Sequence, residues 1–198
     1  MLNKQFFLVT LLSIISGAVT KAETRLYGAG GLGYANSSSA QASTLSNSRI
    51  EMPGGFSIGV DQFYYDSLFI FVEHIRSLGS SGSGIGITTI GLKKYPWLNP
   101  VLKKTMPLSL NTHSTNVYFE GYCIYYGLSL GFAQASLLAE SPSDNILALG
   151  PFANAKLGVE MPLNLKFNIL VESNLGSTFS ATGSILNMNA IIGLIYQL

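Results

Sequence analysis

Apolar side chains recur at every second position in several segments of about ten residues, and turn-rich stretches separate these segments. In the clearest case, residues 165–175, one face carries Leu165, Phe167, Ile169, Val171 and Leu175, and the other carries Lys166, Asn168, Glu172 and Asn174. Successive side chains of a β-strand point to opposite faces of the sheet, so such a segment has one apolar and one polar face. The repeated pattern predicts an all-β protein.

Eight segments of this kind can be placed. They cover approximately residues 25–35, 56–65, 68–78, 84–94, 121–133, 147–160, 165–175 and 186–197. The third and fourth are partly apolar on both faces, so the pattern leaves their orientation open. Pro151 removes one backbone donor from the sixth segment and predicts a bulge or a strand end there.

The composition indicates which face points to lipid or water. Only 11% of the residues are charged and 47% are hydrophobic, whereas a soluble domain carries about 25% charged residues. A soluble β-sandwich, the alternative, would point its apolar face inward and need a charged exterior. After the N-terminal segment no run of about 18 apolar residues exists, which excludes helical membrane spans. These observations predict a closed antiparallel up-and-down transmembrane β-barrel of about eight strands.

The N-terminus has the pattern of a secretory signal peptide. Lys4 precedes an apolar stretch from Phe6 to Ile15, and small residues lead to Ala22. We expect cleavage after Ala22, with Ala18 as the second choice. Cleavage after Ala22 divides the chain into a signal peptide, residues 1–22, and a barrel domain, residues 23–198. An exported barrel is expected in the outer membrane of a Gram-negative cell.

The connections predict which end of the barrel faces outward, because outer membrane barrels have short periplasmic turns and longer outer loops. Short connections are expected near Tyr65 and near Pro162, and a long outer loop is expected from Asn36 to Gly55. Residues 95–116 depart from this rule. We expect an irregular segment there, with one short helix and with Pro96, Trp97, Leu98 and Leu102 bracing the barrel mouth, or else an extra hairpin that raises the strand count to ten.

The few ionised side chains alternate with lipid-facing ones and are therefore expected inside the barrel. The interior of an eight-stranded barrel is only wide enough for side chains. We expect a polar network that closes the lumen, formed by Asp61, Glu73, Lys156, Glu160, Lys166 and Glu172. A narrow pore for small solutes is the alternative.

No motif predicts an enzyme, a cofactor or a metal site. Glu73-His74-Ile75-Arg76-Ser77 invites comparison with a lipid A modifying hydrolase, but His74 and Ser77 are three residues apart and point to opposite faces of a strand. Cys123 is the only cysteine, and the glycines from Gly28 to Gly33 lie within a predicted strand. With a formal net charge of +1, the chain has no basic field for nucleic acid.

Tyrosines and the single tryptophan fall near predicted strand ends, where they would form interfacial girdles. They are Tyr64, Tyr65, Tyr95, Trp97, Tyr118, Tyr122 and Tyr196.

The glycine-aromatic strands 27–34 and 122–132, and the final strand with Leu198 in place of a terminal aromatic residue, resemble small outer membrane barrels of the OmpA and OmpW kind. The resemblance implies an outer membrane location more than an activity. We expect a non-enzymatic, monomeric barrel with a structural or surface-presenting role. It also implies contact with outer membrane lipids and lipopolysaccharide, and insertion by the outer membrane assembly machinery.

Overall fold

The structure is a computed structural model, and the residues that it describes are 24–39, 48–65, 67–79, 83–97, 102–109, 112–118, 121–137, 146–164, 166–180 and 183–198. The predicted signal peptide, residues 1–22, lies outside these residues. The strands are β1 (Thr24–Ser39), β2 (Ser48–Tyr65), β3 (Leu68–Leu78), β4 (Gly84–Lys94), β5 (Leu102–Ser109), β6 (Thr112–Tyr118), β7 (Cys123–Leu137), β8 (Ile146–Pro162), β9 (Phe167–Ser180) and β10 (Gly183–Gln197). In the described part of the chain, no helix has the length and apolar character needed to cross a membrane.

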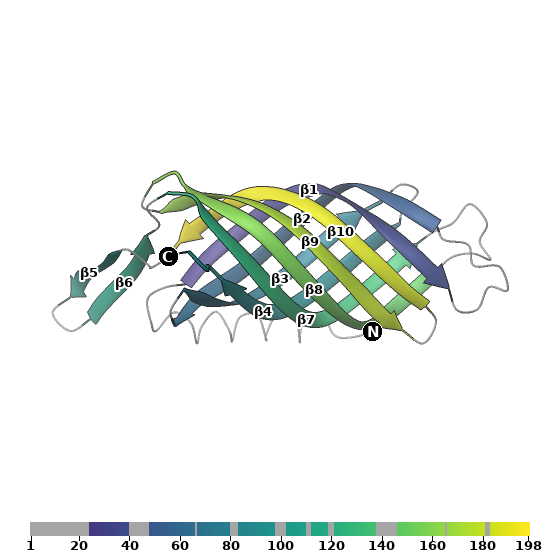
Figure 1. Cartoon of the computed structure of the whole chain (residues 1–198), viewed down its shortest axis with the longest axis horizontal. Helices are drawn as coiled ribbons and strands as arrows, with labels where there is room; N and C mark the ends of the chain where they lie inside the picture. Colours follow the sequence, from purple (N-terminus) through teal and green to yellow (C-terminus); the bar gives the residue numbers. More distant parts are fainter. Residues whose placement is uncertain are drawn as a thin grey trace.

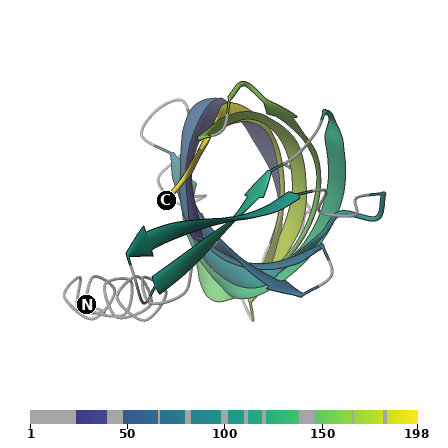
Figure 2. The ribbon, with the colours of Figure 1, turned by 90° about the vertical axis from the view of Figure 1, so that its left-hand side faces the viewer.

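Eight of these strands form a closed antiparallel barrel in the order β1-β10-β9-β8-β7-β4-β3-β2 (Figures 1 and 2). Every neighbour is also the next barrel strand along the chain, and β1 closes the ring against β10. Following direct cross-strand partners once around the ring from Arg25 leads back to β1 at Ala35, ten positions further along. This displacement requires tilted strands and an interior of side-chain width. The predicted fold class and the count of eight barrel strands are confirmed.

The two ends of the barrel differ. At the terminal end β1 begins, β10 ends, and short turns join β2 to β3 and β8 to β9. At the opposite, loop end, connections join β1 to β2, β3 to β4, β7 to β8 and β9 to β10. The predicted long loop from Asn36 to Gly55 is wrong in its bounds, because β1 continues to Ser39 and β2 starts at Ser48. Their ladder pairs Asn36 with Arg49. Ser and Asn suggest a loop in a sequence, yet they are tolerated in a strand that can project beyond the membrane.

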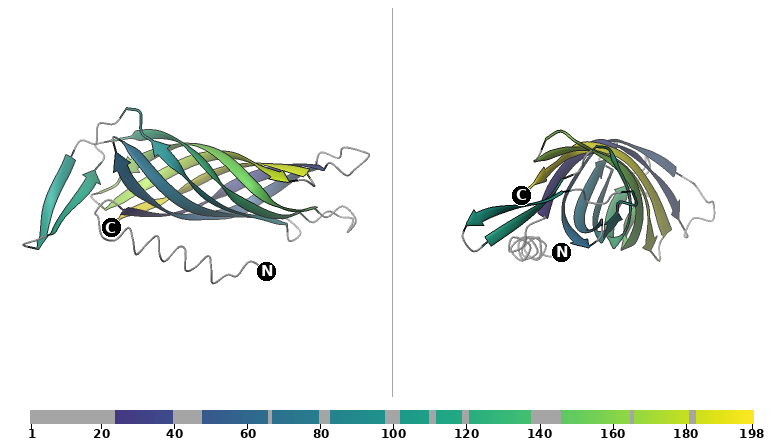
Figure 3. Two further views of the ribbon diagram at one scale, coloured as in Figure 1. Left: turned by 90° about the horizontal axis from the view of Figure 1, so that it is seen from below. Right: turned by 60° about the vertical axis from the view of Figure 1, so that its left-hand side comes forward.

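The expected irregular segment with a helix at 95–116 is also wrong. The alternative of an extra hairpin is correct, but the barrel does not gain the two strands that it predicted. β5 and β6 form a two-stranded sheet of their own, which projects beyond the terminal end and adds no strand to the barrel (Figure 3). Pro107 is accommodated where the register of this hairpin shifts. Pro96 and Trp97 are exposed, Trp97 by 77%, so these two do not brace the mouth. Leu98 lies outside the described residues, as does the side chain of Leu102.

The alternation of side chains follows the closed ring. On β7, Leu128, Leu130 and Phe132 point outward and are 67%, 67% and 62% exposed. Tyr125 and Ser129, on the same strand, point inward and are buried. The structure also decides the orientation that the pattern left open on β3 and β4. Odd-numbered residues there, from Phe69 to Ser77 and from Ile85 to Lys93, point inward.

Pro151 lies inside β8 and pairs with Phe132 of β7, so it does not end the strand. Towards β9, however, the ladder reaches only to Phe152, the residue after the proline. The pairing between β8 and β9 therefore ends next to Pro151, which has no backbone N–H to donate.

Inward-pointing aromatic rings lie against glycines on the neighbouring strand. Tyr27 is directly opposite Gly59, and Tyr125 is directly opposite Gly158. A Cβ atom at either glycine would meet the tyrosine ring, because the ring lies over the glycine backbone. These glycines therefore give the aromatic side chains the space to fill the interior.

We predict that Gly158→Ala lowers the free energy of unfolding by about 1–3 kcal/mol, because the new methyl group collides with the Tyr125 ring. Urea unfolding in lipid vesicles, followed by the gel migration of folded and unfolded chain, measures the change. Gly28→Ala is the matched control, since nothing lies within 4 Å of a Cβ atom at that outward-facing glycine. Equal stability of the two variants would contradict the packing argument.

Candidate functional site

The interior towards the terminal end holds seven charged side chains, which we call the charged layer. Its members are Arg25, Asp61, Glu73, Lys93, Lys156, Glu160 and Glu172. All seven are buried, and they come from six strands: β1, β2, β3, β4, β8 and β9. The layer contains three cations and four carboxylates. A buried charge is tolerated only when it is paired and hydrogen-bonded, so the contacts of each group decide whether the barrel is stable.

Arg25 joins the first half of this layer. Its Nε and Nη2 donate to the two carboxylate oxygens of Asp61 at 2.7 and 2.8 Å, and its Nη1 donates to Glu160 at 2.7 Å. Lys93 donates to the same Asp61 at 3.0 Å. The Tyr95 hydroxyl accepts from Arg25 at 3.0 Å and donates to Glu160. The forked guanidinium suits this position because it can bind two carboxylates at once.

Lys156 joins the second half. Its ammonium donates to Glu73 at 2.6 Å and to Glu172 at 3.0 Å. Ser57 donates a further hydrogen bond to Glu73 at 2.6 Å. Glu172 also accepts from the Tyr125 hydroxyl and, at 2.9 Å, from the Asn174 amide. One cation therefore holds a carboxylate of β3 across the interior and a second carboxylate of the neighbouring strand β9.

Aromatic rings surround the three cations. The Arg25 guanidinium lies 4.2 Å from the centre of the Phe69 ring, and the Lys156 ammonium lies 4.4 Å from that of Phe71. Lys93 lies 4.5 Å from the Tyr27 ring and 5.1 Å from the Tyr125 ring. Cation–π attraction is strongest when the cation is desolvated, so these rings replace part of the hydration that the cations lose.

The structure brings together five of the six side chains that the alternation directed inward, namely Asp61, Glu73, Lys156, Glu160 and Glu172. The expectation for Lys166 is wrong. Lys166 is exposed in the turn between β8 and β9, where the Asn164 side chain accepts hydrogen bonds from the backbone amides of residues 166 and 167. The alternation extends through this turn in the sequence, but the strand begins only at Phe167.

Sequence reasoning missed Arg25, Lys93 and Tyr95. Arg25 occupies the same alternate positions of β1 as the inward-pointing Tyr27 and Ala29, so the alternation in the sequence could have identified it. Lys93 lies in the segment whose orientation the pattern left open. Tyr95 was expected in an interfacial girdle, which is wrong, because it is fully buried in the interior and contacts Tyr125 at a ring-centre distance of 5.2 Å.

Amide and hydroxyl side chains follow the charged layer along the interior. Asn154 donates to Asn174, and Ser77 donates to Asn189, each at 3.4 Å. Within the described residues, one buried polar atom has no hydrogen-bond partner on each of Thr89, Ser129, Asn154, Asn187 and Asn189. Buried polar groups of this kind are commonly satisfied by bound water.

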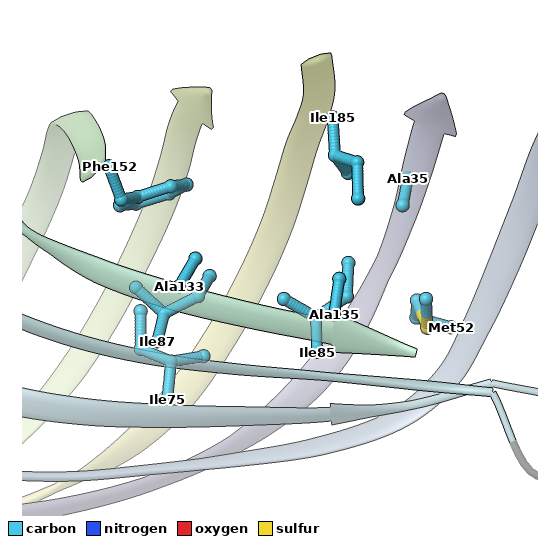
Figure 4. Close-up of a cluster of buried hydrophobic side chains, with 9 residues drawn as sticks. All are labelled: Ala35, Met52, Ile75, Ile85, Ile87, Ala133, Ala135, Phe152 and Ile185. Atoms are coloured by element: carbon cyan, nitrogen blue, oxygen red, sulfur yellow. The ribbon is translucent and has the colours of Figure 1, made fainter. Parts of the chain in front are cut away.

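Apolar side chains fill the interior at the loop end. The cluster consists of Ala35, Met52, Ile75, Ile85, Ile87, Ala133, Ala135, Phe152 and Ile185 (Figure 4). A second cluster, largely aromatic and including Tyr27, Phe69, Tyr95 and Tyr125, lies among the charged side chains at the terminal end. Side chains therefore block the interior at both ends.

The hydrolase constellation considered above has no geometric basis. His74 points outward, where its Nδ1 lies 3.0 Å from Thr88 Oγ1, whereas Ser77 is buried inside. The two side chains lie on opposite faces of β3. The described residues also contain no group of three or more His, Cys, Asp or Glu side chains suited to a metal ion.

The aromatic residues at the membrane-facing ends only partly follow the expected girdles. Tyr64 and Tyr122 are exposed on the exterior near the terminal end, and Tyr196 is partly exposed there. The side chains of Tyr65 and Tyr118 lie outside the described residues. Between the two ends the exterior is covered by large apolar side chains, among them Leu128, Leu130 and Phe132. Such an apolar band is typical of a membrane-spanning barrel.

No known protein family and no curated protein matches the sequence. Solved structures match the fold. Neisserial surface protein A is 11% identical with a TM-score of 0.53, and the match covers 87% of this chain and 97% of that one. The N-terminal β-barrel domain of OprF from Pseudomonas aeruginosa is 8% identical, with a TM-score of 0.49 and coverages of 88% and 98%. The outer membrane protein OprG from the same organism is 13% identical, with a TM-score of 0.44 and coverages of 90% and 97%. The chain has the fold of small eight-stranded outer membrane β-barrels.

We predict that Lys156→Met lowers the free energy of unfolding by about 3–5 kcal/mol, because it leaves two buried carboxylates without their cation. Urea unfolding in lipid vesicles is the measurement.

The matched variant is Lys156→Met combined with Glu73→Gln and Glu172→Gln, which removes the carboxylate charges as well. It should regain part of the lost stability. If the single variant is as stable as the wild type, the ion pairs do not hold this part of the barrel together.

Proposed function

We propose that this chain is an integral outer membrane protein whose closed barrel spans the membrane, has no enzymatic activity and serves a structural or surface-presenting role. The observation that supports this most directly is that apolar and charged side chains have exchanged the places that they take in a soluble protein. Large apolar side chains cover the exterior, whereas Arg25, Lys93 and Lys156 are buried inside. A contiguous apolar exterior of this kind needs a hydrocarbon environment.

The proposed orientation places the terminal end in the periplasm and the loop end outside the cell. Outer membrane barrels have short turns at the periplasmic end, as between β2 and β3 and between β8 and β9, although the β5–β6 hairpin departs from this rule. The loop end carries the connections that surface presentation requires. Residues 1–22 act in this proposal as a signal peptide that is removed during export. The outer membrane assembly machinery then inserts the mature barrel as a monomer.

The interior contacts support a closed lumen. The charged layer joins non-neighbouring strands through the Arg25–Glu160 and Lys156–Glu73 pairs, and the apolar cluster fills the loop end. A narrow pore for small solutes is the second candidate. It is favoured by the unpaired polar atoms midway along the interior, such as those of Thr89 and Ser129, which suit a hydrated section. Transport would require both blocked ends to open.

Fractionation and protease treatment of intact cells test the location. We expect the mature chain in the outer membrane fraction, with an N-terminus at Glu23 and with cleavage confined to the loop end. A protease site engineered between β3 and β4 should be cut from outside, and one placed in the turn between β8 and β9 should resist. Recovery of a monomer in detergent-free buffer would refute membrane insertion.

Planar bilayer recordings separate the two candidates. We predict no stepwise conductance for the wild type, because ion pairs and apolar side chains block the two ends. The variant Phe152→Ala should also show no conductance, since it leaves the charged layer intact. It is the control for the double variant Arg25→Ala with Phe152→Ala, which removes side chains from both blocked ends and should conduct. Stable wild-type channels altered by Lys156→Met would favour the pore.

A further inference from the structure

Arg76 of β3 is an exposed cation on a largely apolar exterior. It lies near the loop end, two residues before the strand ends at Leu78. Its direct cross-strand partners are Phe56 on β2 and Gly86 on β4. Among the residues that the structure describes, its guanidinium has no carboxylate within ion-pair distance. An arginine on the lipid-facing side of a barrel costs about 2–4 kcal/mol at the bilayer midplane and close to nothing near the interface.

The backbone beside Arg76 leaves room for its side chain. A Cβ atom at Gly86 would lie 3.2 Å from Nη1, and one at Gly84 would lie 3.6 Å from Nη2. The guanidinium therefore lies over two positions of β4 that have no side chain. Because β4 begins at the loop end with Gly84, the side chain reaches towards that end and the membrane interface.

Two further polar groups lie next to Arg76 on the same face. His74, two residues before it, contacts Thr88 of β4, with 3.0 Å between Nδ1 and Oγ1. Apolar side chains flank this polar patch on both sides, with Phe56 on β2 and Phe132 on β7 as direct partners of Arg76 and Thr88. The combination of a cation, two hydrogen-bonding side chains and apolar flanks matches a ligand that has both a phosphate group and acyl chains.

We propose that Arg76, with His74 and Thr88 beside it, binds a phosphate group of an outer-leaflet glycolipid of the lipid A class. Its acyl chains then lie along Phe56 and Phe132. A guanidinium binds phosphate oxygens through two parallel charge-assisted hydrogen bonds, which compensates for its transfer out of water. The inference rests on the proposed outer membrane location and orientation, and it names the lipid that the exterior recognises and the residues that do so.

Lipid retention tests the site. The mature chain is folded in phosphatidylcholine vesicles with and without diphosphorylated lipid A, extracted in mild detergent and analysed for bound lipid by native mass spectrometry. We expect wild type to retain lipid A, and Arg76→Gln to retain it on the order of tenfold less tightly. Arg76→Lys should keep part of the binding. Lys94→Gln, which removes a cation from the terminal end, is the matched control and should bind as wild type does.

Two arms identify the ligand group. Lipid A stripped of its phosphates should bind wild type no better than it binds Arg76→Gln, and inorganic phosphate should not displace bound lipid A at millimolar concentration. Equal retention by wild type and Arg76→Gln would overturn the proposed site. Normal folding of Arg76→Gln in phosphatidylcholine vesicles excludes a folding defect. Failure of the wild type to insert into any vesicle would instead refute the proposed membrane location.

Discussion

The stability of the closed barrel depends on Lys156 and Arg25. Each of these cations binds two carboxylates in the interior of a barrel of eight strands. A closed ring in lipid satisfies its backbone hydrogen bonds by pairing every strand on both sides. Its exterior then has to be apolar, so the polar side chains of a short chain are directed inward. There, every charge needs a partner. The Arg25–Glu160 and Lys156–Glu73 pairs join strands that are not neighbours in the ring.

The interior changes character from one end to the other. Charged and aromatic side chains fill the terminal end, amides and hydroxyls follow, and an apolar cluster around Phe152 fills the loop end. The glycines opposite Tyr27 and Tyr125 contribute to the same packing, because each tyrosine ring lies over a glycine of the neighbouring strand, where a Cβ atom would collide with it. A filled interior supports a role carried by the exterior and the loops rather than by a permanent channel.

The exterior is less uniform than the apolar belt alone suggests. Arg76, His74 and Thr88 form a polar patch near the loop end, where lipid headgroups begin in the proposed orientation. The same strand carries Glu73 to the interior, so adjacent residues of one strand serve the lumen network and the lipid-facing surface. This division follows from the two-residue period of a strand.

The sequence by itself determined the fold class, the eight barrel strands and the inward direction of Asp61 and Glu172, because a two-residue period combined with few charges leaves one arrangement of faces in lipid. It could not decide the partners of those carboxylates, since Arg25 and Lys93 meet Asp61 only through strand register and ring closure. The exclusion of Lys166 from the interior, the burial of Tyr95 and the separate β5–β6 hairpin were likewise decided by tertiary structure. Alternation in a sequence carries on through a turn, whereas the ladder of hydrogen bonds that fixes which way a side chain points ends where the strand ends.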